Sequence, residues 1–271
     1  MSVTLLPIAY TLFVWWFSTG AILYLDSLPR ATYRYSMAGA TLLLPLALYG
    51  LAVTRTDVSA SGAYAAFTCA VLVWGWQEVA FLLGYVTGPR QSPRPAGSSE
   101  WQRFVGAVQV VLYHEFALLV LGIAVFAITW SAPNNVGAWT FAILWAMRQS
   151  AKLNLFLGVR NRAEELLPAQ LRYVASYFAR RPMNPLFPVS VTAGTIVAAF
   201  VWESALAPDA SVFAATAATF AGTLLALAII EHWFLVIPIP TTALWNWSLR
   251  PRAAAAAVDA ALAPALPADE K

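Results

Sequence analysis

Charged residues are scarce in this chain of 271 residues: Asp, Glu, Lys and Arg make up only 11% of it. A soluble domain averages about 25% charged residues, and 60% of this chain is hydrophobic. A chain this poor in charge would not remain soluble as a monomer, so its length is best divided into membrane spans. The formal net charge of +3 does not indicate nucleic-acid binding.

Cysteine is almost absent. Cys69 is the single cysteine, which excludes an internal disulfide and a cysteine-based metal site. It lies in an apolar run, where we expect a small buried packing group. The first 24 residues carry no charged side chain, and Arg30 and Arg34 follow them. A cleavable signal peptide needs positive charge ahead of its apolar core, so we expect a retained first helix with a translocated N-terminus.

What the chain does have is long apolar runs. A transmembrane helix needs about 20 largely apolar residues, and seven segments supply them: 3–25, 35–54, 63–87, 104–130, 136–159, 187–206 and 211–237. The sequence therefore predicts an all-α, polytopic transmembrane helical bundle within residues 1–247.

The basic residues predict the orientation of this bundle. Seven spans place thirteen of the sixteen on one side of the membrane: Arg30, Arg34, Arg90, Arg94, Arg103, Arg160, Arg162, Arg172, Arg180, Arg181, Arg250, Arg252 and Lys271. Arg55 alone falls on the other side, and Arg148 and Lys152 lie inside a span. Because cytoplasmic loops are rich in Lys and Arg, we expect the N-terminus outside and the C-terminus in the cytoplasm.

Two segments outside the spans have distinctive compositions. Residues 160–186 place apolar side chains such as Leu171, Val174 and Tyr177 among charges. This pattern predicts an amphipathic helix along the cytoplasmic surface, facing anionic lipid; an ordinary solvated loop helix is the alternative. Residues 248–271 are rich in Ala and Pro, and we expect a disordered tail. No internal repeat supports the inverted-repeat plan of many transporters.

Ionisable residues inside the spans are the candidate functional residues, because charge within a membrane is costly. They form one expected polar layer: Glu78, His114, Glu115, Arg148, Lys152, Asn154, Glu231 and His232. At a rise of 1.5 Å per residue, Glu78, His114 and Glu115 would lie roughly 14–17 Å from the inner ends of their spans. The layer is thus expected in the inner half of the bundle.

Two interpretations of this layer stay open. In the first, Glu78 pairs with Arg148 and Glu231 pairs with Lys152, and the pairs only hold the helices in register. In the second, His114 or His232 is a ligand of a tetrapyrrole or a metal, or the layer handles protons or transports a solute. Against a catalytic metal, there is no His-Glu-x-x-His motif, and helix neighbours such as His114 and Glu115 point about 100° apart.

Several unusual strings resemble the PuhE family of photosynthetic complex assembly proteins of anoxygenic phototrophic bacteria. These strings are VWWFSTG at 14–20, WGWQE at 74–78, YHE at 113–115, RQSAKLN at 148–154, RPMNPLFP at 181–188 and EHWF at 231–234. The resemblance covers about residues 7–244. It implies a role in building the reaction centre–light-harvesting complex, or in handling bacteriochlorophyll for it, in the bacterial inner (intracytoplasmic) membrane.

The resemblance carries over no catalytic residue. It favours a non-enzymatic assembly factor that docks reaction-centre subunits, light-harvesting subunits or other assembly factors, and that holds bacteriochlorophyll or a precursor. One alternative is a membrane enzyme of bacteriochlorophyll metabolism, in which Glu78, His114 and Glu231 supply acid–base groups or ligands. A small-molecule carrier that uses the polar layer as its site is the third hypothesis.

Overall fold

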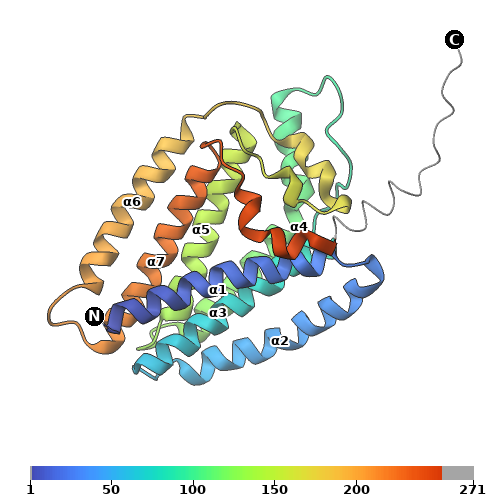
Figure 1. Cartoon of the computed structure of the whole chain (residues 1–271). Coiled ribbons are helices and arrows are strands. Elements are labelled where there is room, and N and C mark those ends of the chain that lie inside the picture. The colour runs from blue at the N-terminus through green and yellow to red at the C-terminus, as the bar shows by residue number, and fades with distance from the viewer. Residues whose placement is uncertain (1, 252–271) are drawn as a thin grey trace, which may run out of the picture.

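The computed structural model describes residues 2–251, and these form the expected all-α bundle (Figure 1). Its long helices are α1 (Ser2–Ser27), α2 (Tyr33–Thr54), α3 (Ala60–Leu82), α4 (Glu100–Thr129), α5 (Val136–Leu157), α6 (Leu186–Ala205) and α7 (Val212–Phe234). Four 3-10 segments connect or follow them: η1 (Arg30–Thr32), η2 (Glu164–Leu166), η3 (Ala169–Tyr177) and η4 (Thr241–Trp245).

Serine residues begin three of the helices. Ser59 and Ser211 are the N-cap residues of α3 and α7. Each side chain accepts a hydrogen bond from the backbone amide three residues later. Ser99 forms a full capping box with Gln102 at the start of α4. Each cap satisfies amide groups that have no partner inside the helix. The end of α5 is marked by Gly158, whose φ of +114° is a conformation that other residues rarely adopt.

The centre of the bundle lies around α3 and α7, which bury the most residues. Helix α3 contacts α1, α2, α4, α5 and α7. Phe67 of α3 stacks on Phe220 of α7 with 4.4 Å between ring centroids, and Phe141 of α5 is fully buried in the same cluster. Apolar packing therefore joins the helices, and the polar layer lies beside this core.

Small residues let α2 and α3 approach closely. A Cβ at Gly50 of α2 would lie 2.4 Å from the Sγ atom of Cys69 on α3, so the thiol fills the space that the glycine leaves. Close approach over small residues is typical of membrane helices. Cys69, which is partly buried, is thus a packing group between two helices.

Six helices in the described part of the chain are long and apolar enough to cross a membrane, and α5 is not among them. The C-terminal half of α5 is polar, because it contains Arg148, Gln149, Lys152 and Asn154. Helices α3, α4, α6 and α7 all contact α5, so its polar face can be shielded from lipid by protein. The prediction of seven spans stays a prediction for this helix.

Two helices end earlier than the hydrophobic pattern suggests. Helix α3 stops at Leu82 and not near residue 87, because the chain turns at Gly84 with a φ of +85°. Helix α7 stops at Phe234 and not near residue 237, where the side-chain amide of Asn161 donates to the carbonyls of Phe234 and Ile237. The apolar residues beyond both ends belong to turns.

The α2–α3 and α4–α5 connections meet in the structure. At one end, the side-chain amide of Asn134 donates to the carbonyls of Thr54, Asp57 and Gly62 at 3.0–3.1 Å. These contacts tie the α2–α3 connection to the α4–α5 connection. The connections rich in arginine lie at the other helix ends. The assignment of that end to the cytoplasm stays a prediction.

The segment 160–186 does not contain the surface α-helix that we expected. It forms η2 and η3, and Leu171, Val174 and Tyr177 of η3 are buried against Phe81 and Val110 of the bundle. These three residues are spaced by three, and a 3-10 helix with three residues per turn places them on one side. The apolar face of this segment therefore packs on the protein itself and not on lipid.

The C-terminal chain is ordered further than the composition suggests. Residues 246–251 are helical, and the Ser248 carbonyl accepts a hydrogen bond from Ser27 at the end of α1. The indole of Trp245 donates to the Trp16 carbonyl at 3.1 Å. Disorder was thus a wrong expectation for residues 248–251, while residues 252–271 lie outside the described part of the chain.

The connection between α3 and α4 packs directly on the backbone of α4. The amide of His114 donates to the Thr87 carbonyl at 2.9 Å. A Cβ at Gly88 would lie only 2.0 Å from the Gln109 carbonyl oxygen. Backbone atoms cannot move aside as a flexible side chain can, so only glycine fits at residue 88.

We expect Gly88→Ala to lower the melting temperature of the detergent-purified protein, because the new methyl group must push the loop away from α4. Overpacking of this kind costs about 1–3 kcal/mol. Gly39→Ala in α2 is the matched control, since nothing lies within 4 Å of its Cβ position and alanine is the better helix former. Equal melting temperatures for the two variants would show that the loop does not depend on this contact.

Candidate functional site

The polar layer lies toward the C-terminal ends of α3, α5 and α7 and beside the middle of α4. Glu78 is only four residues before the end of α3, about 6 Å along the helix. The layer is therefore shallower than the expected 14–17 Å in this helix, because α3 ends at Leu82. The expected contact between Glu78 and Arg148 is present, with 2.8 Å between Oε2 and Nη2.

A second ion pair joins α4 to α5. The Oε1 atom of Glu115 lies 2.5 Å from Nζ of Lys152, and its Oε2 atom accepts from the side-chain amide of Gln149, also at 2.5 Å. Both carboxylate oxygens are thus engaged by residues one turn apart on α5. The expected pair between Glu231 and Lys152 was wrong, because Glu115 holds the lysine.

Glu231 instead accepts a hydrogen bond from an aromatic residue of α1. The Nε1 atom of Trp15 donates to Oε1 of Glu231 at 2.8 Å. The ring of Trp15 also packs edge-on against Trp245 of the C-terminal segment, with centroids 5.5 Å apart. No ion pair forms at Glu231 within residues 2–251. Trp15 was missed by sequence reasoning, although it lies in the VWWFSTG string.

His232 belongs to a chain of neutral hydrogen bonds and not to the ion pairs. Its Nδ1 atom lies 2.7 Å from the Ala228 carbonyl, which can only accept, so Nδ1 carries a proton. Its Nε2 atom lies 2.8 Å from the hydroxyl of Ser150, which also contacts the hydroxyl of Ser190 on α6. Both ring nitrogens of His232 are therefore occupied by protein groups.

The same chain continues through two buried asparagines. Asn154 donates to Ser190 at 3.2 Å and accepts from Asn184 at 3.0 Å. The Oδ1 atom of Asn184 also accepts from the backbone amides of Leu186 and Phe187, which begin α6. The role of Asn154 is thus to fix the end of α5 to the start of α6. Asn184, in the RPMNPLFP string, was not predicted as a site residue.

His114 differs from every other member of the layer. It is 1% exposed, and its Nδ1 atom is buried without a hydrogen-bond partner among residues 2–251. Its ring packs on Phe81 with 4.6 Å between centroids. A buried polar atom without a partner costs free energy, so packing alone does not explain why an imidazole occupies this position.

The charged side chains are not sealed inside the bundle. Arg148 leaves 43% of its side chain exposed, and Lys152 and Glu115 leave 25% and 29%. Charge that faces hydrocarbon is expensive, so such groups face water or a polar partner. The described residues contain no group of three or more His, Cys, Asp or Glu side chains placed to hold a metal ion. Both ion pairs of the layer are thus partly exposed at the surface of the described bundle.

Comparison with known proteins places the chain in a family. The profile of the family described as "Protein of unknown function (DUF3623)" matches residues 1–256. A protein of Rhodobacter capsulatus, described as an uncharacterized 30.4 kDa protein in the puhA 5′ region, is 43% identical over 248 residues, which are 88% of each chain. No solved structure matches the chain. Because the family profile covers nearly the whole sequence, the protein belongs to the DUF3623 family.

Proposed function

We propose that this protein is a membrane assembly factor for the bacterial photosynthetic reaction centre–light-harvesting complex, in the inner (intracytoplasmic) membrane. The relative in the puhA 5′ region supports a photosynthesis-related role, in agreement with the resemblance of the sequence strings to the PuhE family. The observation that carries the proposal is that the ion pairs of α3, α4 and α5 are partly exposed.

The charged residues explain how such a factor would recognise its clients. Arg148, Lys152 and Glu115 are held in fixed positions by their pairing. A client helix with polar or charged groups at the same depth would replace water or lipid around them, and charge complementarity would favour one orientation of the client. A helical subunit of the reaction centre or the antenna has the chemistry of such a client.

A membrane enzyme of bacteriochlorophyll metabolism is the second candidate, and one observation favours it. The Nδ1 atom of His114 has no hydrogen-bond partner in the described part of the chain, as expected of an imidazole that binds a group from outside the protein. The imidazole of His232 is hydrogen-bonded at both nitrogens and does not support this candidate.

Photo-crosslinking in membranes of a phototrophic host tests the docking proposal. A photoreactive amino acid at Leu119, one turn from Glu115 on α4, should form adducts with reaction-centre or light-harvesting subunits. Leu43 of α2 is the matched control: the two leucines are 46% and 48% exposed and lie at similar distances from the helix ends at Thr129 and Thr54. Equal labelling of these subunits from both positions, or none from Leu119, would contradict the proposal.

A further inference from the structure

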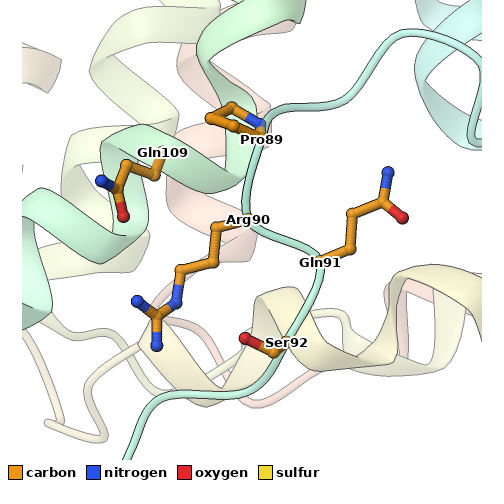
Figure 2. A pocket seen from close by; sticks show the side chains of 5 residues that line it. All are labelled: Pro89, Arg90, Gln91, Ser92 and Gln109. Carbon is orange, nitrogen blue, oxygen red and sulfur yellow. The ribbon is translucent and has the colours of Figure 1, made fainter.

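A cleft lies between the α3–α4 connection and the first turns of α4. It consists of two adjoining hollows of about 330 and 490 Å³ that share Arg90 and Gln109; we call them the Arg90 cleft. Figure 2 shows the Arg90 side chain leaving the connection between Gln109 on α4 and Ser92 further along the loop. No acidic residue lines either hollow, and Arg90 is the one charged residue among those that do.

The guanidinium of Arg90 makes no hydrogen bond or ion pair with residues 2–251. Its Nε atom is buried and makes no hydrogen bond. The backbone amide of Arg90 contacts the Gln109 carbonyl at 3.4 Å, which fixes where the side chain begins. An arginine that is partly desolvated and unpaired is unfavourable unless something else supplies an acceptor.

Neighbouring arginines, by contrast, are committed to the fold. Arg94 donates to the hydroxyl and the carbonyl of Ser98, both at 2.7 Å. Arg103 is buried, contacts Glu100 at 2.7 Å, and donates to the carbonyls of Phe156 and Tyr177. Of these three arginines, two in the α3–α4 connection and one in the first turn of α4, Arg90 alone is available to a ligand.

The surface that continues from the cleft indicates an amphiphilic ligand. Trp101 and Val105 line the larger hollow, and Val108 and Leu112 follow at helical spacing on α4, both exposed. Positions 101, 105, 108 and 112 share one helix face. An exposed tryptophan is typical of the membrane interface. A polar head at Arg90 would thus have an apolar path for its chain along α4 into the membrane.

We propose that the Arg90 cleft binds the phosphate group of an anionic membrane lipid, with one acyl chain lying along the apolar stripe of α4. The guanidinium supplies the charge-assisted hydrogen bonds that phosphate oxygens accept. The side chains of Ser92 and Gln109 offer further donors to the headgroup. This site is separate from the client-docking layer and does not depend on the proposed function.

Native mass spectrometry of the full-length protein in mild detergent tests the lipid site. With phosphatidylglycerol added, the wild type should carry one retained lipid, and phosphatidylcholine should be retained less. Arg90→Gln should lower phosphatidylglycerol occupancy by about fivefold or more, since a charge-assisted bond becomes a neutral one. Arg172→Gln, which removes an exposed arginine of η3, should leave the occupancy unchanged.

Three outcomes would overturn the proposal. An equal loss in Arg90→Gln and Arg172→Gln would show general attraction of a basic surface. Full competition by inorganic phosphate would show a site for a free anion. If Arg90→Gln does not accumulate, Gln109→Leu decides, because it removes the amide shared by both hollows and keeps the charge; unchanged lipid occupancy in that variant would exclude the cleft.

Discussion

Replacing Glu78 with leucine should lower both the melting temperature and the membrane level of the protein. The substitution leaves Arg148 without the carboxylate that now lies 2.8 Å away. Loss of a hydrogen bond to a charged group costs about 1.5–3 kcal/mol, a large part of the stability of a typical protein. The measurements are thermal unfolding in detergent and an immunoblot of the membranes.

Replacing both partners separates a structural pair from a functional one. Glu78→Leu combined with Arg148→Leu should recover most of the melting temperature, because apolar residues of similar volume often replace a buried ion pair without loss of stability. The proposed docking function predicts that this double variant still fails to support normal levels of the photosynthetic complex, measured by the near-infrared spectrum of the membranes.

The control for this pair is Glu203→Leu, which removes an exposed carboxylate at the other end of the bundle, in α6. It should leave both the protein level and the spectrum unchanged. If the double variant restores the spectrum together with the protein level, the pair only holds α3 against α5. The proposal that Arg148 contributes to client docking would then be wrong.

His114→Phe and His232→Phe should have opposite effects on stability. Phenylalanine at 114 keeps the ring contact with Phe81 and removes a buried nitrogen that has no partner, so the melting temperature should stay the same or rise. Phenylalanine at 232 removes the hydrogen bonds to Ala228 and Ser150, each worth about 1 kcal/mol, so the melting temperature should fall.

The functional effect of His114→Phe should be the larger one. We expect this variant to accumulate normally, because phenylalanine keeps the ring packing of His114. The near-infrared absorbance of the photosynthetic complex should fall severalfold, because the variant loses the ring nitrogen that is free to bind another molecule. The spectrum and the immunoblot are taken from the same membranes. A normal spectrum would show that His114 only packs against its neighbours. The single observation that favours an enzyme of bacteriochlorophyll metabolism would then be lost.

Part of the site could be predicted from sequence because charge and depth are local properties. Glu78 and Arg148 have opposite signs and similar expected depths, and the structure pairs them. Lys152 was expected to pair with Glu231, but Glu115 belongs to the same expected layer, and sequence alone could not choose between the two carboxylates. The choice depends on how α4, α5 and α7 are rotated about their axes, which places Glu115 and not Glu231 beside the lysine.

Other partners could not be predicted because they come from distant segments that carry no charge. Trp15 lies 216 residues from Glu231 in the chain, and an indole in a membrane protein is most often an interfacial residue. From the sequence, Asn184 would be expected to be an ordinary polar residue of a loop. In the structure it is 1% exposed, and its hydrogen bonds join α5 to α6. Such contacts exist only once the helices have packed.

The sequence by itself determined that the described chain is an all-α bundle of long apolar helices, and roughly where most of those helices lie, because the hydrophobic run that makes a span is local to about 20 residues. The tertiary structure decided which charges pair, that the apolar face of 160–186 turns onto the bundle, and that the Nδ1 atom of His114 is buried with no hydrogen-bond partner among the described residues. The physical reason is that each of these depends on the rotation and relative height of neighbouring helices, which only the packing of the whole core sets.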